Sequence, residues 1–429
     1  MRVTLVNTVS DGGGAAIAAK RLIYALKLKG VDIHCIVRDG RNSDENITIL
    51  ANSKFKRLMG FIRFALEKFY FLFYEKSSLI RFAFSPAIIG QKISTNKIIK
   101  NSDIIHLHWI NNSFISLREL RRILRAGKPV VWTMHDMWAF TGGCHYTGEC
   151  MNYLNNCGKC PYLKRPGTKD LSNRIFRKKQ ETYRGVPLYI IGISKWIAGC
   201  AKQSNLFKSF PIFSIPNAID TDKFKPFDQK EARNSLNLPK DKRILLFGAA
   251  NIFDERKGLK YLLEALDILV SDYPDYCDNL HCVLFGKAKA SVTMSLPFSQ
   301  FSFISSDSVL VELYSAVDLF ILPSLQDNFP NTILEAMACC TPVVAFNTGG
   351  LTEMIEHKVD GYLAETIEGR QLAQGIIYVL KNNTDNAMGL KARDKIIAEY
   401  SPEKIGETHV QIYNEIITRF NQSKLQAND

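Results

Sequence analysis

Two carboxylates, eight positions apart, are of types that could recognise a substrate. Asp327 lies in a polar loop after the apolar run FILP, and Glu335 lies in PNTILEAM, which is typical of a helix that begins at Pro330 or Asn331. The N–H groups at the start of such a helix attract anionic oxygen, and the carboxylates can accept hydrogen bonds from sugar hydroxyls. The pair predicts a site for phosphate and polyol groups.

Two adjacent cations, Arg256 and Lys257, occupy the turn between a predicted strand, RILLFGA, and a predicted helix, KGLKYLL. In a parallel sheet this turn lies at the same edge as the Asp327 loop, so the cations could neutralise a departing diphosphate. Charge pairs are also common at ordinary solvated helix starts, and the two residues alone do not separate these interpretations.

Four of the ten cysteines, Cys144, Cys150, Cys157 and Cys160, fall within 17 residues of the cysteine-rich segment 141–163. The last pair forms the turn CGKC, which is typical of zinc knuckles, and His145 is an alternate ligand. Structural zinc, free thiols and disulfide bonds stay open, although a reducing cytosol argues against disulfides. We expect the segment to form the side of a site where a second substrate, the acceptor, would bind, rather than to perform chemistry.

The elements that must position these residues alternate between short apolar strands and helices. The strand RVTLVNTV is followed by the loop SDGGG and by a helix that ends at Gly30. Further strands are predicted at 102–109, 129–136 and 187–194, and a second series is predicted at 243–249, 280–286, SAVDLFILPS and TPVVAFNTGG. This alternation predicts parallel sheets wrapped by helices.

The repeated pattern predicts an α/β protein of two doubly wound Rossmann-like domains with an interdomain cleft. We place the N-terminal domain at 1–212, a linker at 213–240, the C-terminal domain at 241–400, and a helix that crosses back to the N-terminal domain at 401–429. Ligands of open parallel sheets collect beyond the carboxyl ends of the strands, so both facing rims are expected to contribute to the site.

Four motifs resemble those of the retaining glycosyltransferases of family four, the type called glycosyl transferases group 1. They are PSLQDNFPNTILEAMACCTPVVAFNTGG, RKGLKYLLEAL, PNAIDTDKFKP and VSDGGGAAIAAKRL, and the resemblance covers nearly the whole chain. It implies the GT-B fold, with the acceptor in the first domain and a nucleotide-diphosphate sugar in the second. It also implies that Asp327 lies beside the donor sugar, that Glu335 binds ribose hydroxyls, and that Arg256 and Lys257 neutralise the diphosphate.

The resemblance assigns roles to further residues. Those placed around the donor are Asn328, Phe329, Asn331, Thr332, Gly12, Gly13 and Gly14. His135, at a strand end, corresponds to a histidine near the sugar and is expected to be catalytic, with Asp327, Arg256 and Lys257.

Other positions at strand ends are expected on the acceptor side. They are His106, His108 and Trp109, although packing explains the two histidines equally well. The chain also departs from the family pattern at three places. Asp327 stands where glutamate is usual, Cys340 where glycine is usual, and Gly248-Ala249 where a glycine–arginine pair is usual, so the arginine role falls to Arg256.

Charge is distributed unevenly along the 429 residues. The net charge of +13 divides into +21 over residues 1–210 and −8 over residues 211–429, so the first half is expected to face an anionic partner. Residues 54–84 hold seven cations, two acids and ten aromatics, which predicts either a helix on a membrane face or an ordinary helical pair packed on the sheet. The N-terminus resembles a mature cytosolic start, and no apolar run is long enough to span a membrane.

These observations predict a retaining, cytoplasmic hexosyltransferase, peripheral on the cytoplasmic face of the plasma membrane. It would move a sugar from a nucleotide-diphosphate donor to a glycan or polyprenyl-diphosphate-linked acceptor in O-antigen, capsule or exopolysaccharide biosynthesis, without a catalytic metal or cofactor and without nucleic acid. The alternatives are a GT-B epimerase or hydrolase of nucleotide sugars, and an inactive membrane-associated scaffold. A nicotinamide enzyme and a serine hydrolase are disfavoured because their motifs are missing from the sequence.

Overall fold

The computed structural model describes residues 1–40, 45–287 and 291–426, which form two compact units. One unit comprises Met1–Pro216 with Ile405–Asp429, and the other comprises Asn217–Lys404. The chain passes from one unit to the other inside the predicted linker, 213–240. The last helix, α15 (Pro402–Gln426), belongs to the first unit from Ile405 onward.

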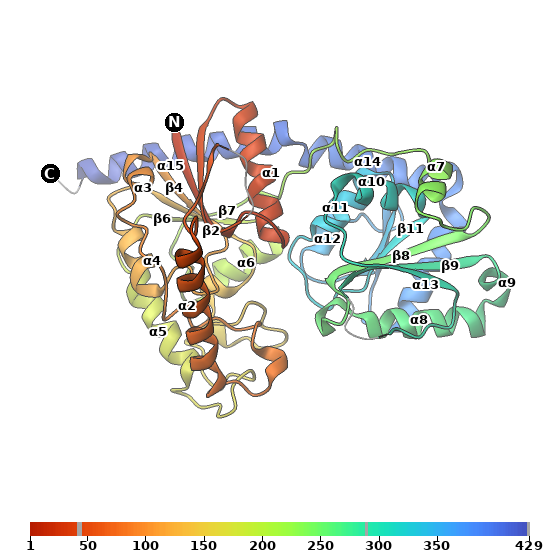
Figure 1. Ribbon diagram of the computed structural model, residues 1–429, viewed down its shortest axis with the longest axis horizontal. Helices are drawn as coiled ribbons and strands as arrows, with labels where there is room; N and C mark the ends of the chain where they lie inside the picture. The colour runs from red at the N-terminus through yellow and green to blue at the C-terminus, as the bar shows by residue number, and fades with distance from the viewer. Residues whose placement is uncertain (41–44, 288–290, 427–429) are drawn as a thin grey trace. The chain divides into compact units, whose positions relative to one another are not determined.

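The first unit is built on a seven-stranded parallel sheet with the strand order β3-β2-β1-β4-β5-β6-β7. Figure 1 labels some of its strands and helices. Its strands are β1 (Arg2–Val9), β2 (Asp32–Asp39), β3 (Ile47–Ile49), β4 (Ile104–Leu107), β5 (Val130–Met134), β6 (Leu188–Gly192) and β7 (Ile212–Ser214). Besides α15, its helices are α1 (Gly14–Leu28), α2 (Lys54–Leu72), α3 (Lys97–Asn101), α4 (Leu117–Leu124), α5 (Leu171–Tyr183) and α6 (Lys195–Gln203), with the 3₁₀ turns η1 (Ser78–Ile80), η2 (Trp138–Phe140) and η3 (Asn152–Leu154).

The second unit is built on a six-stranded parallel sheet with the strand order β10-β9-β8-β11-β12-β13. Its strands are β8 (Arg243–Asn251), β9 (Leu280–Lys287), β10 (Phe298–Phe301), β11 (Leu319–Leu322), β12 (Val343–Phe346) and β13 (Gly361–Ala364). Its helices are α7 (Gln229–Ser235), α8 (Leu259–Asp272), α9 (Pro274–Cys277), α10 (Asp307–Ala316), α11 (Asn331–Ala338), α12 (Leu351–Met354), α13 (Gly369–Asn382) and α14 (Ala387–Tyr400), with the 3₁₀ turns η4 (Glu255–Lys257) and η5 (Thr384–Asn386).

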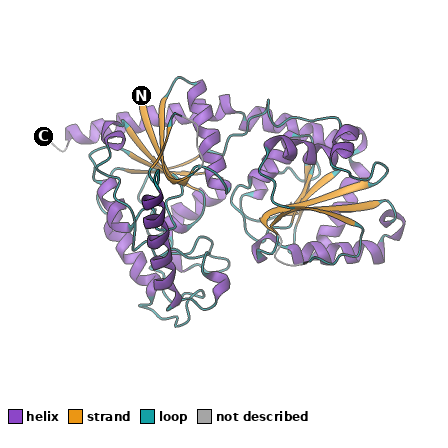
Figure 2. Cartoon of the chain, in the orientation of Figure 1, coloured by secondary structure: helices purple, strands orange, loops and turns teal. Residues whose placement is uncertain are grey.

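In each unit the strands form an inner layer surrounded by helices (Figure 2). The central strands β4, β5, β11 and β12 are buried along their whole length, as expected for parallel strands covered on both faces. This confirms the predicted pair of doubly wound domains.

The strand orders place a topological switch point in each unit. In the first, β1 lies between β2 and β4; in the second, β8 lies between β9 and β11. The connections that leave the two central strands at such a point go to opposite faces of the sheet, which opens a crevice at their carboxyl ends. Gly12, Arg256, Lys257 and Asp327 follow strands at these points.

Over the described residues, no helix combines the length and the apolar character needed to cross a bilayer.

Candidate active site

The cations Arg256 and Lys257 lie in η4, the turn that joins β8 to α8. Asp254 caps this turn, because its side chain accepts a hydrogen bond from the backbone N–H of Arg256 at 3.1 Å. Gly258 follows with a φ of 74°, and a Cβ there would lie 1.9 Å from the carbonyl oxygen of Pro323. Glycine therefore lets the cationic turn press against the end of β11.

Asp327 is buried beside these two cations. The Lys257 ammonium lies 2.5 Å and the Arg256 guanidinium 3.4 Å from its Oδ2 atom. The hydroxyl of Ser324 (3.4 Å) and the backbone N–H of Asn328 (3.1 Å) also donate to the carboxylate. Burial alone would raise the pKa of the Asp327 carboxyl, but the charges of Lys257 and Arg256 and the hydrogen bonds lower it below its ordinary value. The carboxylate is therefore ionised at neutral pH and holds the lysine in place.

The loop after β12 contacts the backbone carbonyl of Asp327. The backbone N–H of Gly350 donates to the Asp327 carbonyl at 3.0 Å. Gly349 has a φ of 58°, and a Cβ there would lie 2.1 Å from the same carbonyl oxygen. No role for these two residues follows from the motif alone, although adjacent glycines after a strand are the signal for such a close approach.

Glu335 lies in the second turn of α11, and it is only 4% exposed. The hydroxyl of Tyr314, on α10, donates a hydrogen bond to its Oε2 atom at 3.2 Å. The other predicted donor residues of this segment, Asn328, Phe329 and Asn331, are buried, while Thr332 is half-buried. The Phe329 ring packs edge-on against Tyr400, with 5.6 Å between the ring centroids. The structure thus brings the cationic turn and the Asp327 loop together at one sheet edge, where the helix that carries Glu335 begins.

The structure shows which constraints act at two of the positions that depart from the family pattern. Cys340 follows α11 with a φ of 62°, the left-handed conformation that glycine adopts at helix ends without cost. At Gly248, a Cβ would lie 1.8 Å from the Phe285 ring, so glycine is required there whatever residue follows.

In the first unit, β1 leads into an open glycine loop. Gly12 and Gly13 have φ values of 78° and 85°, and Gly13 caps α1, whose first residue is Gly14. All three are exposed, and a Cβ on Gly12 or Gly13 would meet no described atom within 4 Å. The first N–H groups of the 15-residue helix α1 are therefore accessible to an anionic group.

His108 and His135 meet at the carboxyl ends of β4 and β5. The His108 Nδ1 and His135 Nε2 atoms are 2.9 Å apart, so one ring donates a hydrogen bond to the other. Burial lowers the pKa of His135 to about 4. His135 is therefore neutral at pH 7, and it can interact with a sugar as a hydrogen-bonding group rather than as a cation.

His106 lies in the interior of the first unit. Its Nδ1 atom is 2.6 Å from the Tyr413 hydroxyl of α15, and its Nε2 atom is 2.7 Å from the Thr133 hydroxyl. Since both ring nitrogens are engaged and the side chain is fully buried, the structure places His106 in packing rather than on an acceptor surface.

A chain of polar contacts links Trp109, the third predicted acceptor residue, to the cysteine-rich segment. Trp109 donates through its indole N–H to Asp136 at 3.0 Å, and His145 Nδ1 lies 2.7 Å from the same carboxylate oxygen. Ser85 is 2.9 Å from His145 Nε2. Burial raises the pKa of Asp136, but His145 and the other hydrogen bonds lower it overall. His145 is therefore engaged through both nitrogens, and its role as an alternate metal ligand stays a prediction.

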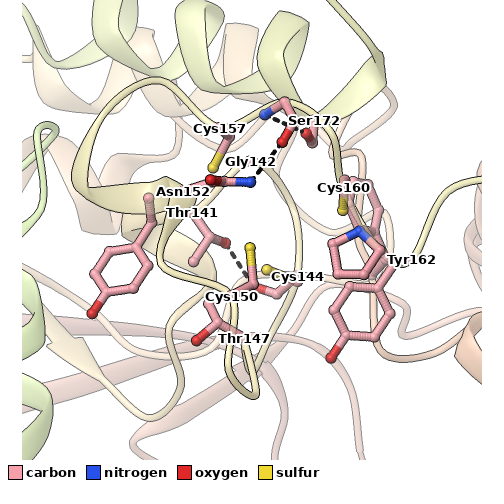
Figure 3. Close-up of a pocket in the computed structure, with 14 residues that line it drawn as sticks. Thr141, Gly142, Cys144, Thr147, Cys150, Asn152, Cys157, Cys160, Tyr162 and Ser172 are labelled. Atoms are coloured by element: carbon pink, nitrogen blue, oxygen red, sulfur yellow. Dashed lines mark hydrogen bonds between the residues drawn. The ribbon is translucent and has the colours of Figure 1, made fainter. Parts of the chain in front are cut away.

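The four cysteines of the segment line one small cavity (Figure 3). All ten cysteines lie within the described residues and are free of disulfide bonds.

Helix α2 buries charged side chains and exposes large apolar ones. Its buried residues include the charged Glu67 and Lys68, and Lys68 donates to the Arg81 carbonyl at 3.0 Å. The outward residues of α2 and the turn after it are large and apolar, with exposures between 46% and 80% for Phe55, Leu58, Phe61, Leu66, Phe69, Leu72, Phe73, Leu79 and Phe82. The cations Lys54, Lys56 and Arg57 are exposed at the start of the helix. A patch of this kind marks an interaction surface.

Doubly wound sheets with phosphate-attracting groups at their switch points are typical of nucleotide-binding proteins. The profile of Glycosyltransferase Family 4 matches residues 12–223, and that of Glycosyl transferases group 1 matches residues 228–398. Together they match most of the chain, which belongs to the group 1 glycosyltransferases of family four.

Curated relatives are similar at low identity. N-acetyl-alpha-D-glucosaminyl L-malate synthase of Bacillus anthracis is 25% identical over 48% of this chain and 54% of the relative. The N,N'-diacetylbacillosaminyl-diphospho-undecaprenol alpha-1,3-N-acetylgalactosaminyltransferase of Campylobacter jejuni is 27% identical over 50% of this chain and 52% of the relative. The chain thus spans about half the length of these two. The putative colanic acid biosynthesis glycosyl transferase WcaC of Escherichia coli is 23% identical over 74% and 76%.

Solved structures match over nearly the whole chain. Sucrose-phosphate synthase from Thermosynechococcus elongatus has a TM-score of 0.65 at 17% identity and covers 97% of this chain and 99% of its own. HepE of Anabaena, in complex with UDP-glucose, has a TM-score of 0.64 at 15% identity and covers 97% and 100%. At these identities the likeness shows the fold alone, and it confirms the GT-B architecture.

Proposed function

We propose that the protein is a retaining glycosyltransferase that moves a sugar from a nucleotide-diphosphate donor to a hydroxyl of a glycan or lipid-linked glycan. The observation that carries this proposal is the ion pair between half-buried Lys257 and buried Asp327 at the switch point of the second unit, with Arg256 beside it. Two cations fixed at a sheet edge are suited to the charge of a diphosphate, which grows as the bond to the sugar breaks.

The donor binds through complementary groups of the second unit. Lys257 and Arg256 contact the diphosphate, and Glu335, steadied by the Tyr314 hydroxyl, accepts hydrogen bonds from the ribose hydroxyls. The ammonium of Lys257 has three N–H donors, so it can bind Asp327 and a phosphate oxygen together. The binding of UDP-glucose by the structurally similar HepE supports a nucleotide-sugar donor for this chain.

In the reaction, the bond from the anomeric carbon to the diphosphate oxygen breaks while the acceptor oxygen bonds to the same carbon on the face that the leaving group vacates. The acceptor proton passes to a diphosphate oxygen. Lys257 and Arg256 stabilise the departing charge as fixed cations. In the first unit, His135, which is neutral at pH 7, and the N–H groups at the start of α1, beside Gly12, Gly13 and Gly14, are suited to bind hydroxyl and anionic oxygen atoms of a substrate.

The acceptor is carried by a membrane lipid at the cytoplasmic face. The exposed face of α2 carries phenylalanines and has cations at one end. Such a face fits an anionic bilayer, because aromatic rings insert into the interface and cations bind the head groups. The Campylobacter relative is named for a diphospho-undecaprenol acceptor and the Escherichia relative for colanic acid biosynthesis, which supports a role in surface polysaccharide assembly.

A donor screen tests the proposal. Purified protein is heated with uridine, guanosine and adenosine diphosphates and with their sugars, and the preferred diphosphate should raise the melting temperature. Release of that diphosphate from its sugar is then measured with and without membrane extract as a source of acceptor. Release only with acceptor supports transfer, whereas equal release without acceptor indicates a hydrolase. Absence of any stabilising diphosphate would indicate an inactive scaffold and overturn the proposal.

A further inference from the structure

The segment 141–163 closes around a cavity of about 20 Å³ lined by Cys144, Cys150, Cys157 and Cys160. The four cysteines, two of them from the turn Cys157–Cys160, lie around a common space (Figure 3). A volume of this size holds a single water-sized particle. The cavity therefore has the size and the lining of a site for one metal ion.

The turn Cys157–Cys160 is held in an unusual conformation. Cys157, Gly158 and Lys159 have φ values of 50°, 107° and 48°, so three successive residues are left-handed. Two of them carry side chains, which costs free energy at each position. The conformation is fixed by hydrogen bonds from the N–H of Cys157 to the Asn152 carbonyl (2.9 Å) and from the N–H of Gly158 to the Ser172 hydroxyl (3.0 Å). Strain that the surroundings impose in this way is typical of functional sites.

A buried lysine lies beside the segment. The Lys179 side chain is fully buried, and its Nζ atom donates to the carbonyls of Trp138 and Thr141, close to Cys144 in the chain. A divalent ion held by four thiolates carries two net negative charges. A lysine in this position offsets part of that charge.

We propose that Cys144, Cys150, Cys157 and Cys160 bind one Zn²⁺ ion, which fixes the loop between β5 and α5. Four protein thiolates give a closed tetrahedral site with Zn–S distances of about 2.3 Å, so the ion is structural and takes no part in sugar transfer. Binding releases four protons as the four thiols become thiolates. Among the described residues, no group of three or more possible ligands stands in metal-binding geometry, so the proposal requires the four sulfurs to move closer together when the ion binds.

Elemental analysis of the purified full-length protein tests the proposal directly. We expect about one zinc per chain in the natural protein, and a loss of at least tenfold in the Cys157→Ser and Cys150→Ser variants. The matched control is Cys277→Ser, which changes a half-buried cysteine of the second unit and should keep the full zinc content. Zinc retained in both cluster variants would overturn the assignment.

A cobalt experiment on the natural protein covers the case in which the variants fail to fold. Replacement of zinc by Co²⁺ should give the visible absorption of a tetrahedral cobalt site together with the charge-transfer band of cobalt–thiolate bonds. Mass spectrometry after alkylation counts the thiols of the metal-free protein. Absence of the cobalt–thiolate bands, with either four freely alkylated thiols or disulfide bonds within the segment, would overturn the proposal.

Discussion

The Lys257 ammonium lies 2.5 Å from a carboxylate oxygen of Asp327, although seventy positions separate the two residues in the chain. The pair forms because Lys257 follows β8 and Asp327 follows β11, and these parallel strands are neighbours in the sheet. Each residue fixes the other, so both are needed to hold the cationic turn in position for the proposed diphosphate.

Lys257→Ala and Asp327→Asn should each lower kcat/KM for sugar transfer on the order of 100-fold or more, which is typical when a fixed charge that stabilises the transition state is removed. The measurement is release of nucleotide diphosphate in the presence of acceptor. Lys260→Ala is the matched control, because Lys260 is a lysine three positions later whose side chain is 76% exposed and pairs with Glu264. Full activity in both Lys257→Ala and Asp327→Asn would contradict the site.

Gly349→Ala should destabilise the protein and lower its activity together. The new Cβ would require a left-handed alanine and would meet the Asp327 carbonyl oxygen at 2.1 Å. Gly127→Ala separates the two effects, because Gly127 has a φ of 72° and a Cβ there meets no described atom within 4 Å. We expect a cost of about 1 kcal/mol for Gly127→Ala and a larger cost for Gly349→Ala in urea unfolding. Equal costs would show that the contact with Asp327 does not constrain the loop.

Stability should fall as the pH drops from about 6.5 toward 4. Burial lowers the pKa of His409 to about 4, whereas an exposed histidine titrates near 6.5. Between these values the unfolded chain binds the proton more readily, so the contribution of His409 is complete above pH 6.5 and is lost as the pH falls through the folded pKa. The loss is about 2 kcal/mol at pH 5. In His409→Gln, the difference between urea midpoints at pH 7.5 and pH 5 should shrink; an unchanged difference would refute the assignment.

Membrane binding should depend on the outward face of α2. The double variant Phe61→Ser, Phe69→Ser removes two rings that are 65% and 59% exposed, so it should weaken binding to vesicles that contain anionic lipid by tenfold or more while leaving the melting temperature unchanged. Phe303→Ser removes a ring of the second unit that is 46% exposed and should bind as the natural protein does. Sedimentation with anionic and with neutral vesicles provides the measurement. Equal sedimentation of all three proteins would exclude this surface as the membrane contact.

The sequence was sufficient to predict contacts that follow from sheet topology. The sequence predicted that Asp327, Arg256 and Lys257 lie together, because the carboxyl ends of parallel strands share one edge. Contacts that depend on helix packing were not predictable in this way. The Tyr314–Glu335 hydrogen bond requires the angle between α10 and α11, and the close approach of Gly349 to Asp327 requires the path of a loop.

The contacts of the histidines were also not predictable from the sequence. Alternation on a strand placed His106 and His108 on one face, but it could not distinguish a packed ring from an acceptor contact. The decisive partner of His106 is Tyr413, 307 positions further along the chain. The Asp136–His145 pair was hidden for a related reason, because both residues lie in irregular chain whose folding has no periodic signal.

The placement of α15 has a consequence for biosynthesis. The sheet of the first unit is complete by Ser214, yet the buried ring of His106 gains its Tyr413 partner only after the following 307 positions of the chain have been synthesised. The second unit, by contrast, is continuous in the chain from Asn217 to Lys404. During translation, the second unit can therefore complete its fold before the first unit does. The first unit stays incomplete until α15 has been synthesised.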